Sequence, residues 1–235
     1  MGAVPGSALA GHIWFPPDVE ASEDFPATTQ GGPVTHSPAH GKLPAMKAKA
    51  QLRRELRQRR REAVAALPDA VRALVFSRPP AAVADMVPAG ACVAIYDAMP
   101  LEAPAEAYGR WFFERGHDIA LPWFAGRGGE MQFRRWANPH IDALLEPDPF
   151  GARQPAADAP LVTPDVLFAP LLGFTASGGR MGQGGGHYDR WLAAHPARLV
   201  IGLAWDCQLV DELPLESHDV TMNAVVTPTR LYGPF

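Results

Sequence analysis

The feature of this sequence that most constrains its fold is an apolar run followed closely by a dense cluster of glycines. Residues 166–174 read Val-Leu-Phe-Ala-Pro-Leu-Leu-Gly-Phe, and residues 182–186 read Gly-Gln-Gly-Gly-Gly. Each glycine costs about 0.5–1 kcal/mol relative to alanine, so a plain connector has no need of so many. Such a loop suits a backbone that approaches a ligand closely and directs its N–H groups toward it. Phosphate is the usual ligand, because bare amides and the N-terminus of a following helix favour anions.

Three side chains beside these glycines have the chemistry of a nucleotide site. Arg180 provides a forked cation suited to phosphate, Tyr188 a hydroxyl or a stacking ring, and Asp189 an oxygen ligand of the kind Mg²⁺ prefers. Asp189 is equally consistent with a helix-start carboxylate stabilised by the helix dipole. The loop is not a Walker A loop, and the dinucleotide spacing would require a glycine where His187 stands. An anion-binding turn is favoured over a tight structural turn.

Short apolar strands alternate with helices along the rest of the chain. This pattern predicts a three-layer α/β fold, with a mostly parallel sheet covered by helices on both faces. Helices are expected at 47–67, 69–77, 102–115 and 188–194; strands at 91–96, 117–121, 131–136, 165–174, 198–205 and 222–226; and an irregular span at 138–164. In such sheets ligands collect at the carboxyl ends of strands. The glycine loop and the segment after Tyr96 both lie at such ends.

Composition limits the domain organisation and the class of protein. Residues 1–45 are rich in Pro, Gly, Ser and Thr and show no regular period, which predicts a poorly ordered or surface-docked extension. Residues 46–235 are expected to form a single α/β domain. A net charge of -4 argues against nucleic-acid binding by bulk charge. No apolar run approaches the roughly 20 residues of a membrane helix, and no secretory signal is evident. We expect a cytoplasmic monomer in which Cys92 and Cys207 are buried thiols.

A basic segment precedes the α/β pattern. Residues 47–67 hold eight cations against two anions, a local charge of +6, with leucines and alanines forming one apolar stripe. Three interpretations are open for its cations. They form a solvated face, which composition favours, or one or two of them contact a phosphate ligand. The third interpretation, RNA binding, is weakened by the lack of interleaved aromatic residues.

The glycine loop and four other segments together resemble one enzyme family. The run from Gly178 to Arg190 resembles the signature of the 5-formyltetrahydrofolate cyclo-ligase family. The other matching segments, in the family's order, are 49–53, 95–102, 145–147 and 216–219. The family usually has Asp at the position of Thr175 and an aromatic residue at that of His187. Thr175 keeps a hydroxyl without a charge, while His187 alters the stacking, adds a titratable group or is a polar surface residue.

The resemblance implies a fold similar to the NagB/RpiA/CoA-transferase-like fold and a reaction that consumes ATP with Mg²⁺. The product is 5,10-methenyltetrahydrofolate, released with ADP and phosphate. The formyl oxygen attacks the γ-phosphate, N10 then attacks the iminium phosphate, and phosphate leaves as the ring closes. Such chemistry asks the protein mainly for positioning and charge neutralisation. The implied partners are small molecules, ATP and 5-formyltetrahydrofolate with or without a polyglutamyl tail, and neither nucleic acid nor membrane.

The resemblance also assigns roles to individual residues. The predicted catalytic residues are Lys49, Arg180 and Tyr188. The predicted ATP-binding residues are Lys49, Arg53, Arg180, Met181, Gly182, Gln183, Gly184, Gly185, Gly186, His187 and Tyr188. Glu102 and Asp97 are expected to bind the folate, and Asp189 and Asp219 to hold Mg²⁺. The aromatic residues that either wall the pterin or belong to the core are Trp123, Phe124, Phe133 and Trp136.

Other functions compatible with these residues are a different nucleotide-binding phosphotransferase, an RNA-binding module using the basic helix, and an inactive paralogue that binds folate without turnover.

Overall fold

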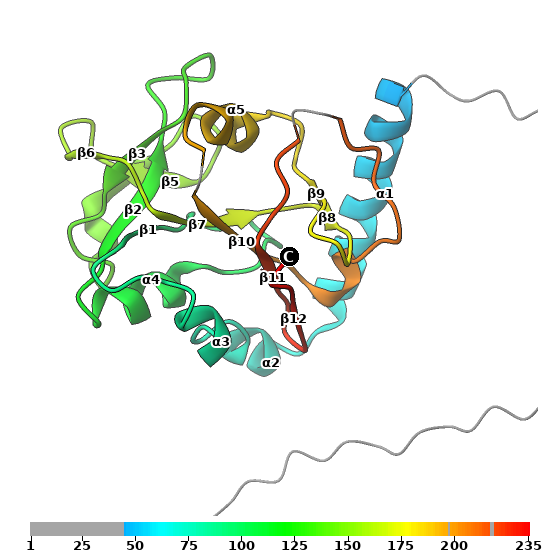
Figure 1. Cartoon of the computed structure of the whole chain (residues 1–235), viewed down its shortest axis with the longest axis horizontal. Coiled ribbons are helices and arrows are strands. Elements are labelled where there is room, and N and C mark those ends of the chain that lie inside the picture. Colours follow the sequence, from blue (N-terminus) through cyan, green and yellow to red (C-terminus); the bar gives the residue numbers. More distant parts are fainter. Residues whose placement is uncertain (1–44, 197, 217–218) are drawn as a thin grey trace, which may run out of the picture. The chain divides into compact units, whose positions relative to one another are not determined.

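The computed structural model describes residues 45–196, 198–216 and 219–235 (Figure 1). The extension predicted for residues 1–45 lies outside this range except for Ala45, with which the first helix begins. Ser217 and His218, in the matching segment 216–219, also lie outside the described residues. Among the described helices, none has both the length and the apolar character needed to cross a bilayer.

An eight-stranded sheet forms the centre of the described residues, in the order β12-β11-β10-β7-β1-β2-β3-β6. The strands are β1 (Cys92–Ala94), β2 (Asp118–Trp123), β3 (Gln132–Arg135), β6 (Leu161–Val162), β7 (Val166–Pro170), β10 (Leu199–Leu203), β11 (Ala224–Val226) and β12 (Leu231–Tyr232). Strands β11, β10, β7, β1 and β2 pair in parallel, and antiparallel pairs lie toward both edges. The predicted mostly parallel sheet is therefore confirmed.

Helices cover both faces of this sheet (Figure 1). The helices are α1 (Ala45–Ala66), α2 (Asp69–Leu74), α3 (Ala81–Ala84), α4 (Glu106–Phe113) and α5 (His187–Ala194). Successive residues of a strand point to opposite faces. Phe168 of β7 accordingly packs on Tyr108 and Phe112 of α4, while the neighbouring Leu167 belongs to the cluster that contains Trp191 of α5. The predicted three layers result from this alternation.

Two predicted boundaries near the functional segments are wrong. The strand expected at 165–174 ends at Pro170, and β8 (Gly173–Phe174) instead forms a hairpin with β9 (Arg180–Met181). The helix expected from Glu102 begins at Glu106. Pro104 accounts for the later start, because the residue before a proline is disfavoured in helical conformation. Glu102 therefore lies in a loop at the end of the sheet.

The span 138–164, predicted to be irregular, contains short regular elements. These are the 3₁₀ helix η1 (Asp142–Leu144), the hairpin of β4 (Leu145–Pro147) and β5 (Arg153–Pro155), and β6. Asp148 closes this hairpin, since its Oδ1 accepts N–H bonds from Phe150, Gly151 and Ala152. Elements this short have too few residues to show a period. Helix α3 and the 3₁₀ helix η2 (Asp206–Gln208) were not predicted, because they too are so short.

Helix α1 packs along the β8–β9 hairpin. Leu56 is buried with Leu172 and Met181 in a cluster separate from the two main cores. A Cβ atom on Gly173 would lie 2.7 Å from Leu56 Cδ1, so glycine at this position permits the close approach. Arg59 further donates hydrogen bonds to the carbonyl groups of Cys207 and Leu209. The basic helix is thereby placed beside the glycine loop.

Two leucines in different strands test this description of the core. Leu167 of β7 is fully buried, whereas Leu161 of β6 is 62% exposed. Leu167→Ala should lower the free energy of unfolding by about 2–5 kcal/mol, because the truncation leaves a cavity. Leu161→Ala should change it by less than about 0.5 kcal/mol. Urea denaturation followed by tryptophan fluorescence measures both, and similar losses in the two variants would contradict the assignment of β7 to the core.

Candidate active site

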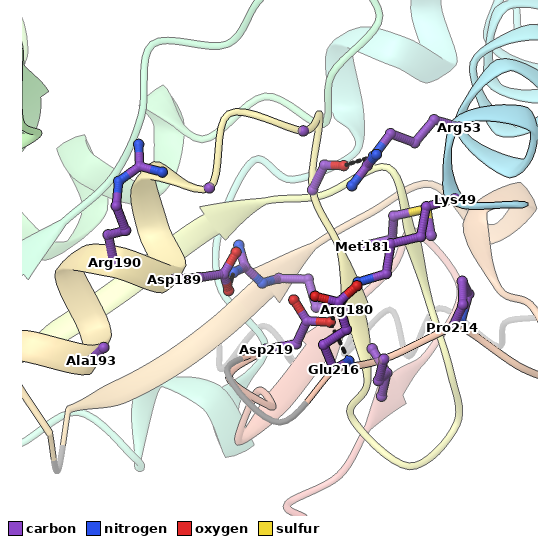
Figure 2. Close-up of a pocket in the computed structure, with 14 residues that line it drawn as sticks. Lys49, Arg53, Arg180, Met181, Asp189, Arg190, Ala193, Pro214, Glu216 and Asp219 are labelled. Atoms are coloured by element: carbon purple, nitrogen blue, oxygen red, sulfur yellow. Dashed lines mark hydrogen bonds and ion pairs between the residues drawn. The ribbon is translucent and has the colours of Figure 1, made fainter. Parts of the chain in front are cut away.

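Two cavities meet at the glycine loop. The larger cavity, of about 600 Å³, is lined by the start of α1, the loop, α5, residues 214–216 and Asp219 (Figure 2). The smaller cavity, of about 170 Å³, lies at the carboxyl ends of β1, β2 and β7, as expected for a parallel sheet. Four residues line both cavities: Arg180, Gly182, Gly186 and Asp189. A ligand in one cavity would therefore share a wall with a ligand in the other.

The larger cavity receives cations from the basic helix. Lys49 Nζ donates a hydrogen bond to Asp219 Oδ2 at 3.1 Å and lies 3.0 Å from Glu216 Oε1 (Figure 2). Arg53 Nε donates to the carbonyl oxygen of Gly182 at 3.2 Å. Both cations line the cavity. The structure thus brings Lys49 and Arg53 to the glycine loop, as the phosphate-contact interpretation of the helix requires.

Glycine is needed in this loop for two different structural reasons. Gly184 and Gly186 have φ angles of +114° and +64°, which glycine adopts without strain. Gly182 is not among the positive-φ glycines, but a Cβ there would point into open space, so its backbone is bare toward the cavity. Gly186 is also the N-cap of α5. The loop accordingly presents exposed backbone next to a helix N-terminus, an arrangement that favours anions.

Arg180 lies in the shared wall with its charge buried. Its side chain is 3% exposed and forms an ion pair with Asp189 in the first turn of α5. Its Nε has no hydrogen-bond partner among the described residues. A buried donor without a partner is costly, so it marks a position where a ligand group would complete the hydrogen bonding.

The smaller cavity contains a buried carboxylate and a buried phenol. Glu102 Oε2 accepts a hydrogen bond from the Met99 N–H at 3.1 Å, and burial raises the pKa of Glu102. Tyr188 Oη is buried without a partner within the described part of the chain. Burial, and then the charge of Glu102, raise the pKa of Tyr188, so the phenol keeps its proton and acts as a donor. Glu102 and Tyr188 therefore give the cavity an acceptor and a donor alongside its other polar groups.

Residues 45–228, well over half of the chain, match the sequence model of the 5-formyltetrahydrofolate cyclo-ligase family. The chain belongs to the 5-formyltetrahydrofolate cyclo-ligase family. The cyclo-ligase of Escherichia coli K12 is 47% identical over 75 residues, which cover 31% of this chain and 41% of that protein. The mouse cyclo-ligase is 26% identical over 145 residues, covering 57% and 71%. The aligned residues thus span less than half of the bacterial relative.

Solved structures share the fold of this family member. The 5,10-methenyltetrahydrofolate synthetase of Mycoplasma pneumoniae superposes with a TM-score of 0.53 at 20% identity, over 75% of this chain and 96% of that one. The Aquifex aeolicus synthetase gives a TM-score of 0.50 at 22% identity, over 81% and 89%. The further likeness to the NagB/RpiA/CoA-transferase-like fold stays a prediction.

The family signature divides between the two cavities. Of the predicted ATP-binding residues, those that line the larger cavity are Lys49, Arg53, Arg180, Met181, Gly182, Gly184 and Gly186, and those that line the smaller cavity without the larger are Gln183, Gly185, His187 and Tyr188. The sequence alone does not show this division. The loop separates the two cavities, and residues that are neighbours in the sequence line different cavities. Gln183 points toward Glu102, to which its Nε2 donates at 3.2 Å.

Asp97, predicted to bind the folate, anchors a hairpin instead of presenting a free carboxylate. Its Oδ2 accepts the backbone N–H of Arg153 at 2.8 Å, and its Oδ1 accepts from Arg153 Nη2 at 2.6 Å. Asp97 still lines the smaller cavity. The pair ties the β4–β5 hairpin to the end of β1, which places Phe150 beside the cavity. Its contact with a folate stays a prediction.

Of the four aromatic residues expected either to wall the pterin or to belong to the core, only Phe124 lines the smaller cavity. Phe124 lines the cavity as expected, with Phe150 and His187 at ring-centroid distances of 4.9 and 5.0 Å from it. Phe133 and Trp136 are buried core residues, at 1% and 2% exposure. Phe150 was missed, although the Asp-Pro-Phe-Gly sequence around it is a turn signal that exposes the aromatic side chain.

The two departures from the family pattern have separate explanations. Thr175 lines neither cavity, and its Oγ1 accepts the N–H of Gly179 at 3.0 Å to close the β8–β9 turn. A hydroxyl oxygen is a sufficient acceptor for that bond. His187 accepts a hydrogen bond from Arg190 Nη2 at its Nδ1, 3.1 Å away. Its ring is therefore neutral and serves as part of the aromatic wall.

Two aspartate side chains of the larger cavity have the oxygen donors that Mg²⁺ prefers. Asp189 and Asp219 reach the cavity from different segments, paired with Arg180 and Lys49 respectively. Across the described ranges, no group of three Asp, Glu, His or Cys side chains is placed to hold an ion by itself. Mg²⁺ beside a phosphate ligand usually takes one or two protein carboxylates, and the two aspartates have that chemistry.

The stability of the protein should depend on His187 at mildly acidic pH. Burial, and then the charge of Arg190, lower the pKa of His187 below its ordinary 6.5. Below about pH 6.5 the His187 imidazole is protonated in the unfolded chain but stays neutral in the folded chain. The free energy of unfolding therefore falls as the pH decreases toward the folded-state pKa. The Tm of the wild type should therefore fall further than that of His187→Phe over this window. His140→Phe, outside both cavities, is the control, and equal slopes for wild type and His187→Phe would contradict the assignment.

Proposed function

We propose that this protein converts 5-formyltetrahydrofolate to 5,10-methenyltetrahydrofolate at the expense of ATP, with release of ADP and phosphate. The observation that carries the proposal is the shared wall between the two cavities, which holds Arg180 and Asp189. Phosphoryl transfer between two bound molecules needs this arrangement, because the donor phosphate and the acceptor oxygen must meet while each molecule keeps its own site.

The larger cavity is assigned to ATP and the smaller to the reacting end of the folate. Lys49, Arg53 and the bare glycine backbone complement a triphosphate. The smaller cavity has aromatic walls formed by Phe124 and Phe150. Apolar walls with a few placed polar groups are typical of a site for a flat heterocycle. Glu102 would accept hydrogen bonds from ring N–H groups.

The proposed reaction proceeds in two steps. The formyl oxygen attacks the γ-phosphorus of ATP, so that an O–P bond forms, the bond to the bridging oxygen breaks and ADP leaves. N10 then attacks the formyl carbon and loses its proton. The carbon–oxygen bond to the phosphate group breaks, so phosphate leaves as the ring closes.

The residues of the shared wall neutralise the charge that develops in this reaction. Arg180 lies where the γ-phosphate would pass between the cavities, and its buried guanidinium needs no reorganisation to stabilise the transferring group. Lys49 would bind phosphate oxygens, and the Tyr188 phenol would donate to the folate. Mg²⁺, held by Asp189 and Asp219, would offset the charge of the triphosphate. We also propose that the protein is a monomer in the cytoplasm.

The experiment that tests the proposal is the absorbance rise of methenyltetrahydrofolate in a mixture of protein, ATP, Mg²⁺ and 5-formyltetrahydrofolate. Arg180→Ala should lower kcat by about 100-fold or more, by the measure of other preorganised donors in transition-state sites. Arg78→Ala, an exposed arginine outside both cavities, should leave kcat unchanged. No product from the wild type, or product formed without ATP, would refute the proposal. ADP release that ignores 5-formyltetrahydrofolate would indicate a different phosphotransferase.

The magnesium assignment predicts a shifted metal requirement. Asp189→Asn removes one of the two carboxylates, so the Mg²⁺ concentration at half-maximal activity should rise by about tenfold or more. Asp165→Asn is a matched control, because it also breaks an Arg–Asp pair but lies outside both cavities. A magnesium titration of Asp189→Asn that superposes on the wild-type curve would remove this residue from the metal site.

A further inference from the structure

Gln183 joins three segments that are far apart in the sequence. Its Oε1 accepts a hydrogen bond from Arg57 Nε of α1 at 3.2 Å, and its backbone oxygen accepts from Arg57 Nη2 at 3.0 Å. On the other side, its Nε2 donates to Glu102 Oε1 at 3.2 Å. This arrangement fixes the orientation of the amide, because a flip would set its NH₂ against a guanidinium and its oxygen against a carboxylate.

The same residue lies between the two cavities. The side chain of Gln183 lines the smaller cavity, while its neighbours Gly182 and Gly184 line the larger. Arg53, one helical turn before Arg57, also lines the larger cavity and donates to the Gly182 carbonyl. A nucleotide that draws α1 and the loop together would therefore act directly on the segment that orients the Gln183 amide.

Glu102 depends on a small number of donors for its position. One of its oxygens is held by the Met99 N–H and the other by Gln183. The preceding Leu101 has a φ angle of +73°, which is uncommon for a residue other than glycine. A carboxylate at the end of such a turn has to be held by its surroundings.

The charge of Glu102 also depends on its surroundings. Burial raises its pKa, whereas the hydrogen bonds from Met99 and Gln183 and the charge of Arg60 oppose the rise. The titratable groups that act on Glu102 or on which Glu102 acts are Arg60 of α1, Tyr96 after β1, Glu106 of α4 and Tyr188 of α5. Loss of the Gln183 bond would therefore favour the protonated acid.

We infer that Gln183 is a positioning residue that couples the two cavities, so that a nucleotide in the larger cavity strengthens folate binding in the smaller one. Gln183 holds Glu102 in place for the folate and is itself held by α1, which also lines the nucleotide side. The inference rests on the proposed function, because it takes ATP and 5-formyltetrahydrofolate as the two ligands. By reciprocity, the folate strengthens nucleotide binding by the same factor.

Calorimetric titration of the full chain with 5-formyltetrahydrofolate tests this coupling, with and without magnesium and the non-hydrolysable analogue β,γ-imido-ATP. In the wild type, the analogue should tighten folate binding by about 5-fold or more. In Gln183→Leu, which keeps the volume and removes the hydrogen bonds, this factor should fall below about twofold and folate alone should bind more weakly. The Kd of the analogue alone should stay within about twofold of the wild-type value.

Two further variants separate coupling from a folding defect. Arg57→Met releases Gln183 from α1 but keeps the pair with Glu102, so it should lower the coupling and leave the affinity for folate alone nearly unchanged. Gln58→Leu makes the same change as Gln183→Leu on the exposed face of α1 and should behave as the wild type. Circular dichroism and Tm confirm that each variant is folded.

The pH profile provides a readout that a purely structural role would not move. Because Gln183 favours the ionised form of Glu102, Gln183→Leu should shift the acidic limb of the kcat/KM profile to higher pH. A wild type that binds both ligands independently, or a folded Gln183→Leu that keeps the full coupling and the wild-type acidic limb, would overturn the inference. A wild type that fails to bind or convert 5-formyltetrahydrofolate would overturn the proposed function instead.

Discussion

Strand β7 is paired on both edges and covered on both faces, and this constraint organises the domain around it. Its neighbours β1 and β10 take its backbone hydrogen bonds, and its side chains are divided between two cores. A strand in this position must be apolar throughout, because it has no solvent-facing side. After the carboxyl end of β7 the chain leaves the sheet, so the residues that follow can line a cavity. The functional segments are therefore gathered at that end of the sheet.

The chain between β7 and α5 determines how the site is divided. The β8–β9 hairpin leads away from the sheet and packs against Leu56 of α1. The chain then returns through the glycine loop into α5. The loop thus passes between two spaces and forms a wall of each, with Arg180 buried between them. The proposed transfer between two substrates would use this partition, which arises from one hairpin and one loop.

The basic helix illustrates how a charge pattern acquires its meaning from packing. Arg53, Arg57 and Arg59 donate to carbonyl or amide oxygens of the same chain, and Lys49 pairs with Asp219. The three arginines hold the glycine loop and the η2 region, and Lys49 and Arg53 also line the larger cavity. Arg60 is buried within electrostatic range of Glu102, and two of its nitrogen atoms have no partner in the described part of the chain. The composition of this helix favours a solvated face, but its packing makes it part of the candidate site.

The sequence by itself determined the α/β class, the placement of the glycine loop after a buried strand and the family, because strand and helix periods and the spacing of Arg180, Tyr188 and Asp189 are local properties. Tertiary structure alone decided which cavity each residue faces. Gln183 turns toward Glu102, and Asp97 is held by Arg153. Phe150 lines the smaller cavity, whereas Phe133 and Trp136 belong to the core. These outcomes depend on pairings between segments distant in the chain, such as that of Glu102 with Gln183, which are 81 positions apart. Local patterns carry no record of such pairings, so only the folded chain shows them.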